Sequence, residues 1–189
     1  DDLNNIKKIQ KINIDVLDNR GWSKNALFIL KDKNSTIQVK NKKNFKSNIK
    51  IIYDFGFCDY KGNVRISGDK KDHLELENGN LKASLDVILK KGNINSSTKF
   101  KLFLPKTRNS NNEIFSTLLL KELGFLSPST FNVNIELNGL QYNVLFQEKA
   151  VKELLEKNLR VEGPIFEGDE EILWKNRNKY SNFRTMQLE

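Results

Sequence analysis

The residues best suited to bind a charged ligand are basic side chains near a short apolar strand predicted over residues 99–104. Lys99 and Lys101 alternate with apolar residues on this strand, so both lysines project from one face of it. Arg108 follows the strand and could hold a phosphate group through two parallel hydrogen bonds. The alternatives are a pair of solvated strand lysines and, for Arg108, an ordinary ion pair in a loop. Lys82, just before the preceding strand, is a rival candidate.

A helix directly after these basic residues is predicted by its capping signals. Ser110 and Glu113 have the spacing of a capping box, in which the serine hydroxyl accepts a backbone N–H and the glutamate reaches back. Apolar residues then recur at helical spacing, and Gly124 is the expected left-handed stop. Glu113 could instead orient one of the lysines, but a capping carboxylate is already occupied by the backbone. Glu122 is the other carboxylate on this helix.

A hairpin is predicted around Asn138-Gly139, because both residues tolerate the positive φ of a type I′ turn. Pairing through this turn sets Phe131 opposite Phe146 and puts the apolar residues of both strands on one face. Other strands are predicted over 12–16, 26–30, 35–40, 48–57, 64–68 and 84–90, turns at 19–21 and 59–63, a loop at 41–48 and a second helix over 148–159. We therefore predict an α+β fold, a mostly antiparallel sheet with two helices packed on it.

The order of these elements resembles the nucleotide-binding lobe of a protein kinase: a strand with lysines, a helix with a glutamate, two strands and a connector. This resemblance implies that Lys99 or Lys101 pairs with phosphate and that Glu113 orients the lysine. It also implies that the backbone at Gln147 and Glu148 meets the adenine ring.

Several short motifs, in order and spacing, make the resemblance more specific. They are an R-x-x-G-x pattern (Arg65, Gly68, Asp69), a strand led by Ser84, a Phe/Lys-rich strand ending near Arg108, a helix ending in Leu-Gly, and an Asn-Gly hairpin whose second strand ends at Glu148. Together these motifs resemble the spore-coat CotH kinase-like family over residues 62–172. That family implies an atypical protein kinase, secreted or located in the cell envelope, which transfers phosphate from ATP, with magnesium, to serine in secreted or coat proteins.

The chain departs from this family in two ways. Asn143 stands in the second hairpin strand where the family usually has glycine. No sequence after Glu148 resembles the motifs that carry the catalytic and magnesium-binding aspartates of a kinase. We therefore expect an N-terminal β-rich segment over 1–47, a kinase-like region over 48–172 and a tail over 173–189 that continues into a further lobe. We assign no catalytic residue and no metal ligand to this chain.

Two other functional classes stay open. The fold could serve as a non-catalytic interaction module that binds a coat or envelope protein. The net charge of +8 permits nucleic-acid binding, but the lysines come singly and in pairs without interleaved aromatic residues, which disfavours it. No apolar run approaches the roughly 20 residues of a membrane span, so we predict a soluble protein without a transmembrane segment. A cytoplasmic location remains the alternative to a secreted one.

The remaining candidates have a structural and a functional interpretation each. Cys58 lies in an apolar run, which favours a packed side chain over a nucleophile. Asp69, Asp72 and His73 follow Gly68 and could face a ligand, although turn formation is the simpler role. An acidic run over 167–171 could bind a cation, but its spacing fits no calcium loop and favours a solvated segment.

Overall fold

The structure, a computed structural model, describes residues 8–168 and 186–188. The chain divides into two compact units, Asp1–Lys149 and Ala150–Glu189. The second unit contains α3 (Lys152–Lys157), β10 (Phe166–Gly168) and β11 (Met186–Leu188), and its two strands form an antiparallel pair. No helix in the described residues has the length and hydropathy needed to cross a bilayer.

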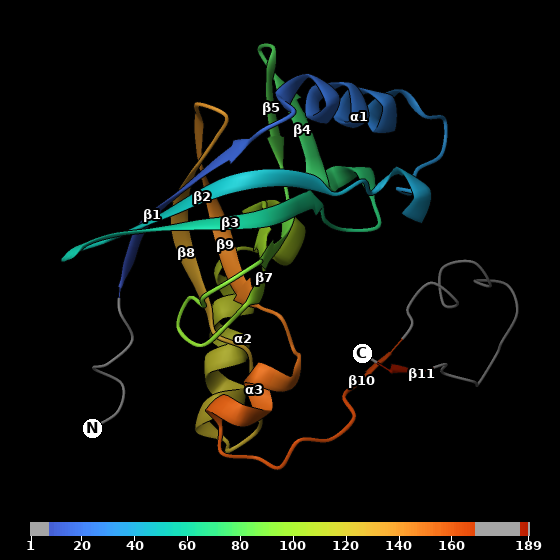
Figure 1. The fold of residues 1–189 in the computed structure, drawn as a ribbon. Coiled ribbons are helices and arrows are strands. Elements are labelled where there is room, and N and C mark those ends of the chain that lie inside the picture. Colours follow the sequence, from blue (N-terminus) through green and yellow to red (C-terminus); the bar gives the residue numbers. More distant parts are fainter. Residues whose placement is uncertain (1–7, 169–185, 189) are drawn as a thin grey trace, which may run out of the picture. The chain divides into compact units, whose positions relative to one another are not determined.

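The first unit is built on a closed barrel of seven strands (Figure 1). Around the barrel, the strands run in the order β1 (Ile9–Val16), β2 (Phe45–Tyr53), β3 (Gly56–Ile66), β6 (Leu85–Leu89), β7 (Lys99–Phe103), β9 (Leu140–Glu148) and β8 (Thr130–Leu137). Most strands alternate inward apolar residues with outward, mainly polar ones, which is the pattern of a sheet buried on one face. The fully buried interior side chains include Ile12, Ile51, Ile66, Leu85, Phe100, Leu102, Ile135 and Val144.

The closed barrel shows that the predicted fold class is wrong. We expected a mostly antiparallel sheet with two helices, resembling the open sheet of a kinase lobe. The described residues instead form a closed barrel with three small α-helices. Closure depends on β1, which pairs antiparallel with β2 and parallel with β8, setting Ile12 beside Ile135. These strands lie far apart in the chain, so no local pattern reveals the pairing.

The first helix, α1 (Asn19–Lys31), occupies a region predicted as a turn and a strand. Asp18 caps the helix by accepting a hydrogen bond from the Gly21 N–H at 2.9 Å. Trp22, Ala26 and Ile29 are buried at helical spacing, so the apolar run at 26–30 belongs to a helix that buries Ala26 and Ile29 and leaves Leu27 and Phe28 exposed. The strand predicted at 35–40 is also wrong: only Thr36 forms a bridge, with Lys70, and a short 3-10 helix, η2 (Val39–Asn41), follows.

The β2–β3 hairpin differs from the sequence prediction at both of its strands. β2 begins at Phe45, inside the predicted loop, and β3 runs unbroken through the predicted turn at 59–63. Glycine suits position 62 of β3, because a Cβ atom there would come within 2.6 Å of the Ile88 carbonyl oxygen on β6. Cys58 is exposed near the tip of this hairpin, so the prediction that it is packed is wrong.

The β8–β9 hairpin confirms the sequence prediction in type and register. Phe131 pairs with Phe146 and Leu137 with Leu140, and Asn138 and Gly139 both have positive φ. Asn138 also ties the turn to β1, since its Oδ1 accepts a hydrogen bond from the Val16 N–H at 2.8 Å. The turn residue therefore also helps to close the barrel.

The remaining elements of the first unit cover parts of the barrel. β4 (Leu74–Glu77) and β5 (Asn80–Ala83) form a separate hairpin. Two 3-10 turns, η3 (Lys71–His73) and η4 (Pro105–Arg108), follow β3 and β7. The helix α2 (Asn111–Glu122) buries Thr117, and Gly124 follows it with φ of +80°, as expected for a left-handed stop. In Figure 1, α1 and α2 lie on opposite sides of the barrel.

Candidate anion-binding site

The candidate site lies on the outer face of the barrel, where three strand pairings align four polar side chains. Arg65 on β3 pairs with Asp86 on β6, Asp86 with Lys101 on β7, and Lys101 with Gln147 on β9. Directly paired residues of antiparallel strands share a face, so these side chains form one continuous row. The row runs across strands whose inner faces form the core, and the barrel therefore fixes its spacing.

Phe103 is the centre of a second cluster beside this row. Its ring is only 1% exposed although it points outward from the barrel. The guanidinium carbon of Arg108 lies 4.2 Å from the ring centroid, and Lys101 Nζ lies 5.8 Å from it. The His73 ring is also close, with its centroid 5.8 Å away and tilted by 52°. Three nitrogen-bearing side chains from β7, η4 and η3 thus surround one aromatic ring, which attracts cations through its face.

Neither Lys101 nor Arg108 has an ion-pair partner within 4.0 Å among the described residues. Both side chains are half-buried, and the Nε atom of Arg108 is buried without a hydrogen-bond partner in the same part of the chain. A partly buried cation without a counter-charge is costly, because it loses hydration that nothing replaces. The arrangement is therefore suited to receive an anion.

A third cation near the cluster is already neutralised. Lys42 Nζ contacts Asp69 Oδ1 at 2.5 Å. This hydrogen bond is the main reason that the pKa of Asp69 lies below its ordinary value, and the charges of Lys42, Lys101 and His73 lower it further. Lys42 is thus less available to an added anion than Lys101 or Arg108.

The buried carboxylate of Asp86 also has a cationic partner. Asp86 is 4% exposed, and its Oδ2 accepts hydrogen bonds from Arg65 Nε at 3.0 Å and Nη2 at 2.6 Å. This pairing occupies Arg65, so the first residue of the R-x-x-G-x pattern stabilises the neighbouring strands of the row that contains Lys101. Sequence reasoning missed Asp86, although a carboxylate inside the apolar run over 84–90 was a usable signal.

Glu113 does not form the predicted capping box. Ser110 makes no side-chain capping bond and has a φ of +52°. Glu113 Oε1 instead accepts a hydrogen bond from Gln147 Nε2 at 2.6 Å. This contact links α2 to the end of the polar row, next to Lys101. The predicted helix carboxylate therefore lies close to the predicted lysine through Gln147 rather than by a direct ion pair.

Three other predicted residues lie outside this cluster. Lys82 contacts Glu77 Oε2 at 2.9 Å across the β4–β5 hairpin. Lys99 is half-buried two residues before Lys101 and pairs with Ile88 rather than with the polar row. Glu148 points into the barrel, where its carboxylate accepts hydrogen bonds from Ser97 Oγ at 2.6 Å and from the Ser129 N–H at 3.2 Å.

The backbone at Gln147 has strand neighbours on both sides, Lys101 on β7 and Thr130 on β8. A hinge that binds an adenine ring needs free backbone donors and acceptors. In the closed barrel, β9 has no free edge at Gln147, and this disfavours the predicted contact between its backbone and an adenine ring.

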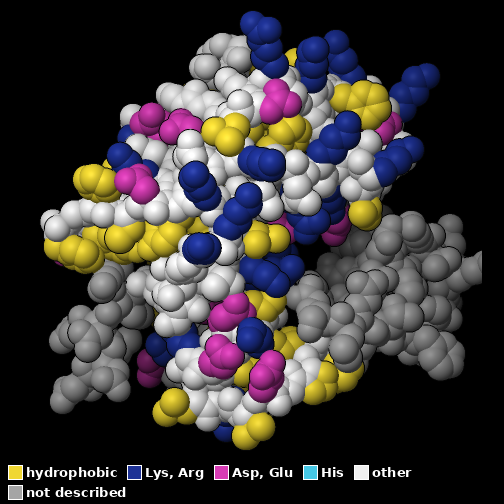
Figure 2. All heavy atoms as spheres, in the orientation of Figure 1, with side chains coloured by type: hydrophobic (Ala, Val, Ile, Leu, Met, Phe, Trp, Pro, Cys, Tyr) yellow, Lys and Arg dark blue, Asp and Glu magenta, His cyan; other side chains and the backbone are white. Residues whose placement is uncertain are grey.

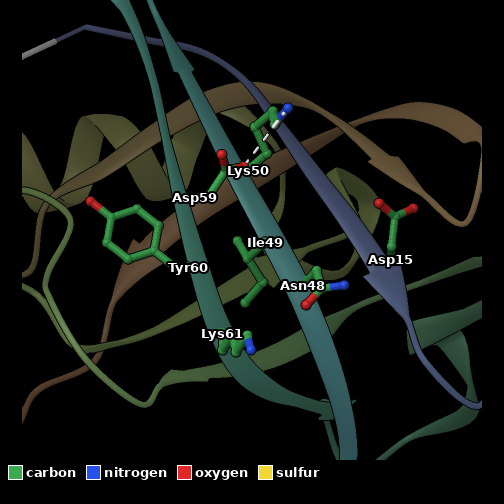
Figure 3. A pocket seen from close by; sticks show the side chains of 7 residues that line it. All are labelled: Asp15, Asn48, Ile49, Lys50, Asp59, Tyr60 and Lys61. Atoms are coloured by element: carbon green, nitrogen blue, oxygen red, sulfur yellow. Dashed lines mark ion pairs between the residues drawn. The ribbon is translucent and has the colours of Figure 1, made fainter.

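Two surface hollows in the described part of the chain lie on other faces of the barrel. The first, of about 330 Å³, is lined by side chains of β1, β2 and β3, and the Lys50–Asp59 ion pair crosses it at 3.8 Å (Figure 3). The second lies over β1, β8 and β9. Asp15 and Asp59 balance Lys50 and Lys61 around the first hollow, so it offers no excess charge to a ligand.

Basic residues are spread over the face that Figure 2 shows, with acidic residues between them. No group of three metal-binding side chains occurs within residues 8–168 and 186–188. The acidic run predicted as a possible cation site falls largely outside the described residues. Among known proteins, no family model and no curated protein matches this chain.

Proposed function

We propose that this chain binds the phosphate groups of a nucleotide at Lys101 and Arg108. ATP is the nucleotide implied by the sequence motifs, as the ligand of a CotH-like atypical protein kinase that acts on serine in secreted or coat proteins. The observation that carries the proposal is the pair of half-buried cations that share the Phe103 ring without an ion-pair partner among the described residues. Phosphate oxygens would supply the missing counter-charge and accept the guanidinium hydrogen bonds.

Each part of the site has a separate role in this proposal. Arg108 would bind a phosphate through its fork of N–H donors, and Lys101 would act as a mobile point charge beside it. Gln147 would position Lys101 from the next strand, because its own amide is held by Glu113. We assign no residue to magnesium, which would enter with the nucleotide, and no catalytic acid or base to this chain.

A thermal-shift titration with ATP and magnesium tests the proposal, with AMP and buffer as references. A ligand at 100 times its Kd stabilises the folded state by about 2.7 kcal/mol, or about 5–10 °C for a chain of this size. We expect this rise for ATP, a smaller one for AMP, and loss of most of the rise in Lys101→Ala and Arg108→Ala.

Lys82→Ala is the matched control, since it removes a lysine whose ion pair with Glu77 lies on another hairpin. It should keep the full response to ATP. The proposal is wrong if millimolar ATP gives no shift, or if Lys101→Ala and Arg108→Ala respond as the unaltered chain does while melting normally without ligand.

The alternative function is a non-catalytic module that binds a coat or envelope protein. It is favoured by the outward face of α2, on which Phe115 is 68% exposed beside the exposed Leu118, Leu119 and Leu123. A helix whose apolar side faces water is suited to bind another apolar surface. This alternative predicts no response to ATP, and loss of protein binding in Phe115→Asp with the melting temperature unchanged.

A further inference from the structure

The position of His73 suggests a role beyond turn formation. His73 is 9% exposed, and its ring lies between Gly68 and Phe103, 5.8 Å from the centre of the aromatic ring that Arg108 also contacts. The backbone holds it there, because the His73 carbonyl accepts a hydrogen bond from the Ser84 N–H at 2.8 Å. The imidazole therefore has a defined place beside the anion site.

Both ring nitrogens of His73 lack a hydrogen-bond partner in the described part of the chain. Nδ1 is buried and unpaired, and Nε2 lies 4.0 Å from Asp72 Oδ1, too far for a hydrogen bond. A buried polar nitrogen without a partner is unusual in a folded protein and calls for an explanation. A bound anion next to Arg108 would supply an acceptor.

We propose that His73 is a third contact of the anion site, so that the site prefers a doubly charged oxyanion such as a terminal phosphate and binds it with uptake of a proton. This inference rests on the proposed function, because it places the anion at Lys101 and Arg108. Three cationic groups then match the two charges of the ligand better than they match a single charge.

The surroundings of His73 determine how the anion affinity should change with pH. Burial lowers the pKa of His73; Asp72 raises it, Arg108 lowers it, Asp69 raises it and Lys42 lowers it. The neutral imidazole is therefore favoured in the ligand-free protein. An anion beside Arg108 would offset the repulsion between the Arg108 guanidinium and a protonated His73, and would therefore favour the imidazolium. Binding and protonation then strengthen each other, so affinity rises as the pH falls, by up to about tenfold per pH unit where the proton is taken up.

NMR can follow this group directly, because His73 is the only histidine in the chain. We would titrate its ring proton signals between pH 5 and 8 at constant ionic strength in chloride, with and without saturating sulfate. Sulfate keeps two charges over this range, so a pH dependence belongs to the protein. We expect sulfate to raise the pKa of His73 and to bind more tightly at pH 5.5 than at pH 8. Arg108→Ala should abolish the shift, and His73→Gln should make sulfate affinity nearly independent of pH.

The inference is overturned if sulfate does not bind, or if His73 titrates at the same pH with and without it. It is also overturned if His73→Gln keeps the pH dependence of the affinity. Failure of the nucleotide proposal gives a different result: sulfate binds and shifts His73, while ATP gives no thermal shift at any pH. The experiments therefore distinguish failure of the nucleotide proposal from failure of the inference about His73.

Discussion

Gly68 and His73 are in such close contact that a side chain at position 68 would overlap the imidazole in its present place. A Cβ atom on Gly68 would lie 1.9 Å from Cδ2 of the imidazole, and the backbone there has a φ of +88°. This contact, together with Phe103, fixes the His73 ring beside the cations of the candidate site. The glycine of the R-x-x-G-x pattern thus supports the site by its lack of a side chain.

Gly68→Ala should therefore destabilise the protein more than the same substitution at a glycine that has a similar positive φ but no close neighbour. Gly79 is the matched control, because its φ is +79° and a Cβ atom added there would have no other atom within 4 Å. We expect Gly79→Ala to cost about 1–2 kcal/mol of unfolding free energy and Gly68→Ala to cost about 1–3 kcal/mol more, measured by urea denaturation. Equal costs would show that His73 is free to move away.

Arg65→Met should be strongly destabilising, because it leaves the buried carboxylate of Asp86 without its two hydrogen bonds. Removing one partner of a buried pair costs about 3–5 kcal/mol, and the 35% exposure of Arg65 suggests the lower end. Lys50→Met is the control, since its ion pair with Asp59 is exposed and 3.8 Å long, and it should cost below about 1 kcal/mol. Denaturant unfolding of both variants measures the difference, and a similar small cost for both would contradict the assigned role of Asp86.

The unfolding free energy should fall as the pH drops below about 6.5, the ordinary pKa of histidine. Because burial lowers the pKa of His73 in the folded chain, the unfolded chain takes up this proton first, and stability decreases down to the folded pKa. A second decrease should follow in acid, where Asp69 is protonated in the unfolded chain before its lowered folded pKa is reached. His73→Gln should remove the first decrease and keep the second, as followed by chemical denaturation across pH. A curve unchanged by this substitution would assign the first decrease elsewhere.

Cys58 should react with a thiol reagent in the folded protein. The side chain is exposed near the tip of the β2–β3 hairpin, beside the exposed Phe57. We expect labelling in native buffer within about tenfold of the rate in denaturant, because no unfolding has to precede the reaction. Mass spectrometry over a time course measures both rates. Strong protection in the native state would instead support the packed position that its apolar neighbours suggested.

Local sequence was sufficient to determine the β8–β9 hairpin. The Asn138-Gly139 turn and the alternation on either side act over a few residues, so they determine pairing and face together. The strand that carries Lys99 and Lys101 was also predictable, and so was the left-handed stop at Gly124. In each of these regions, only one local structure satisfies the pattern.

Tertiary structure decided the elements with ambiguous local patterns. The apolar run over 26–30 fits a buried strand or part of an amphipathic helix, and only packing of α1 against the core selects the helix. Glu113 fits a capping box by its spacing, but Gln147 from β9 offers it a side-chain donor instead. Gly62 suggested a turn, whereas its actual role is to let β6 approach β3.

The barrel and the candidate site both arise from contacts between distant segments. The parallel pairing of β1 with β8 closes the sheet, and the Phe103 cluster joins His73, Lys101 and Arg108 from three separate elements. The sequence by itself determined the strand that carries Lys99 and Lys101 and offered the basic residues as candidates for binding an anion. Only the fold decided which of them meet, because side-chain proximity across a barrel depends on strand order and register, which are set by the packing of the whole core.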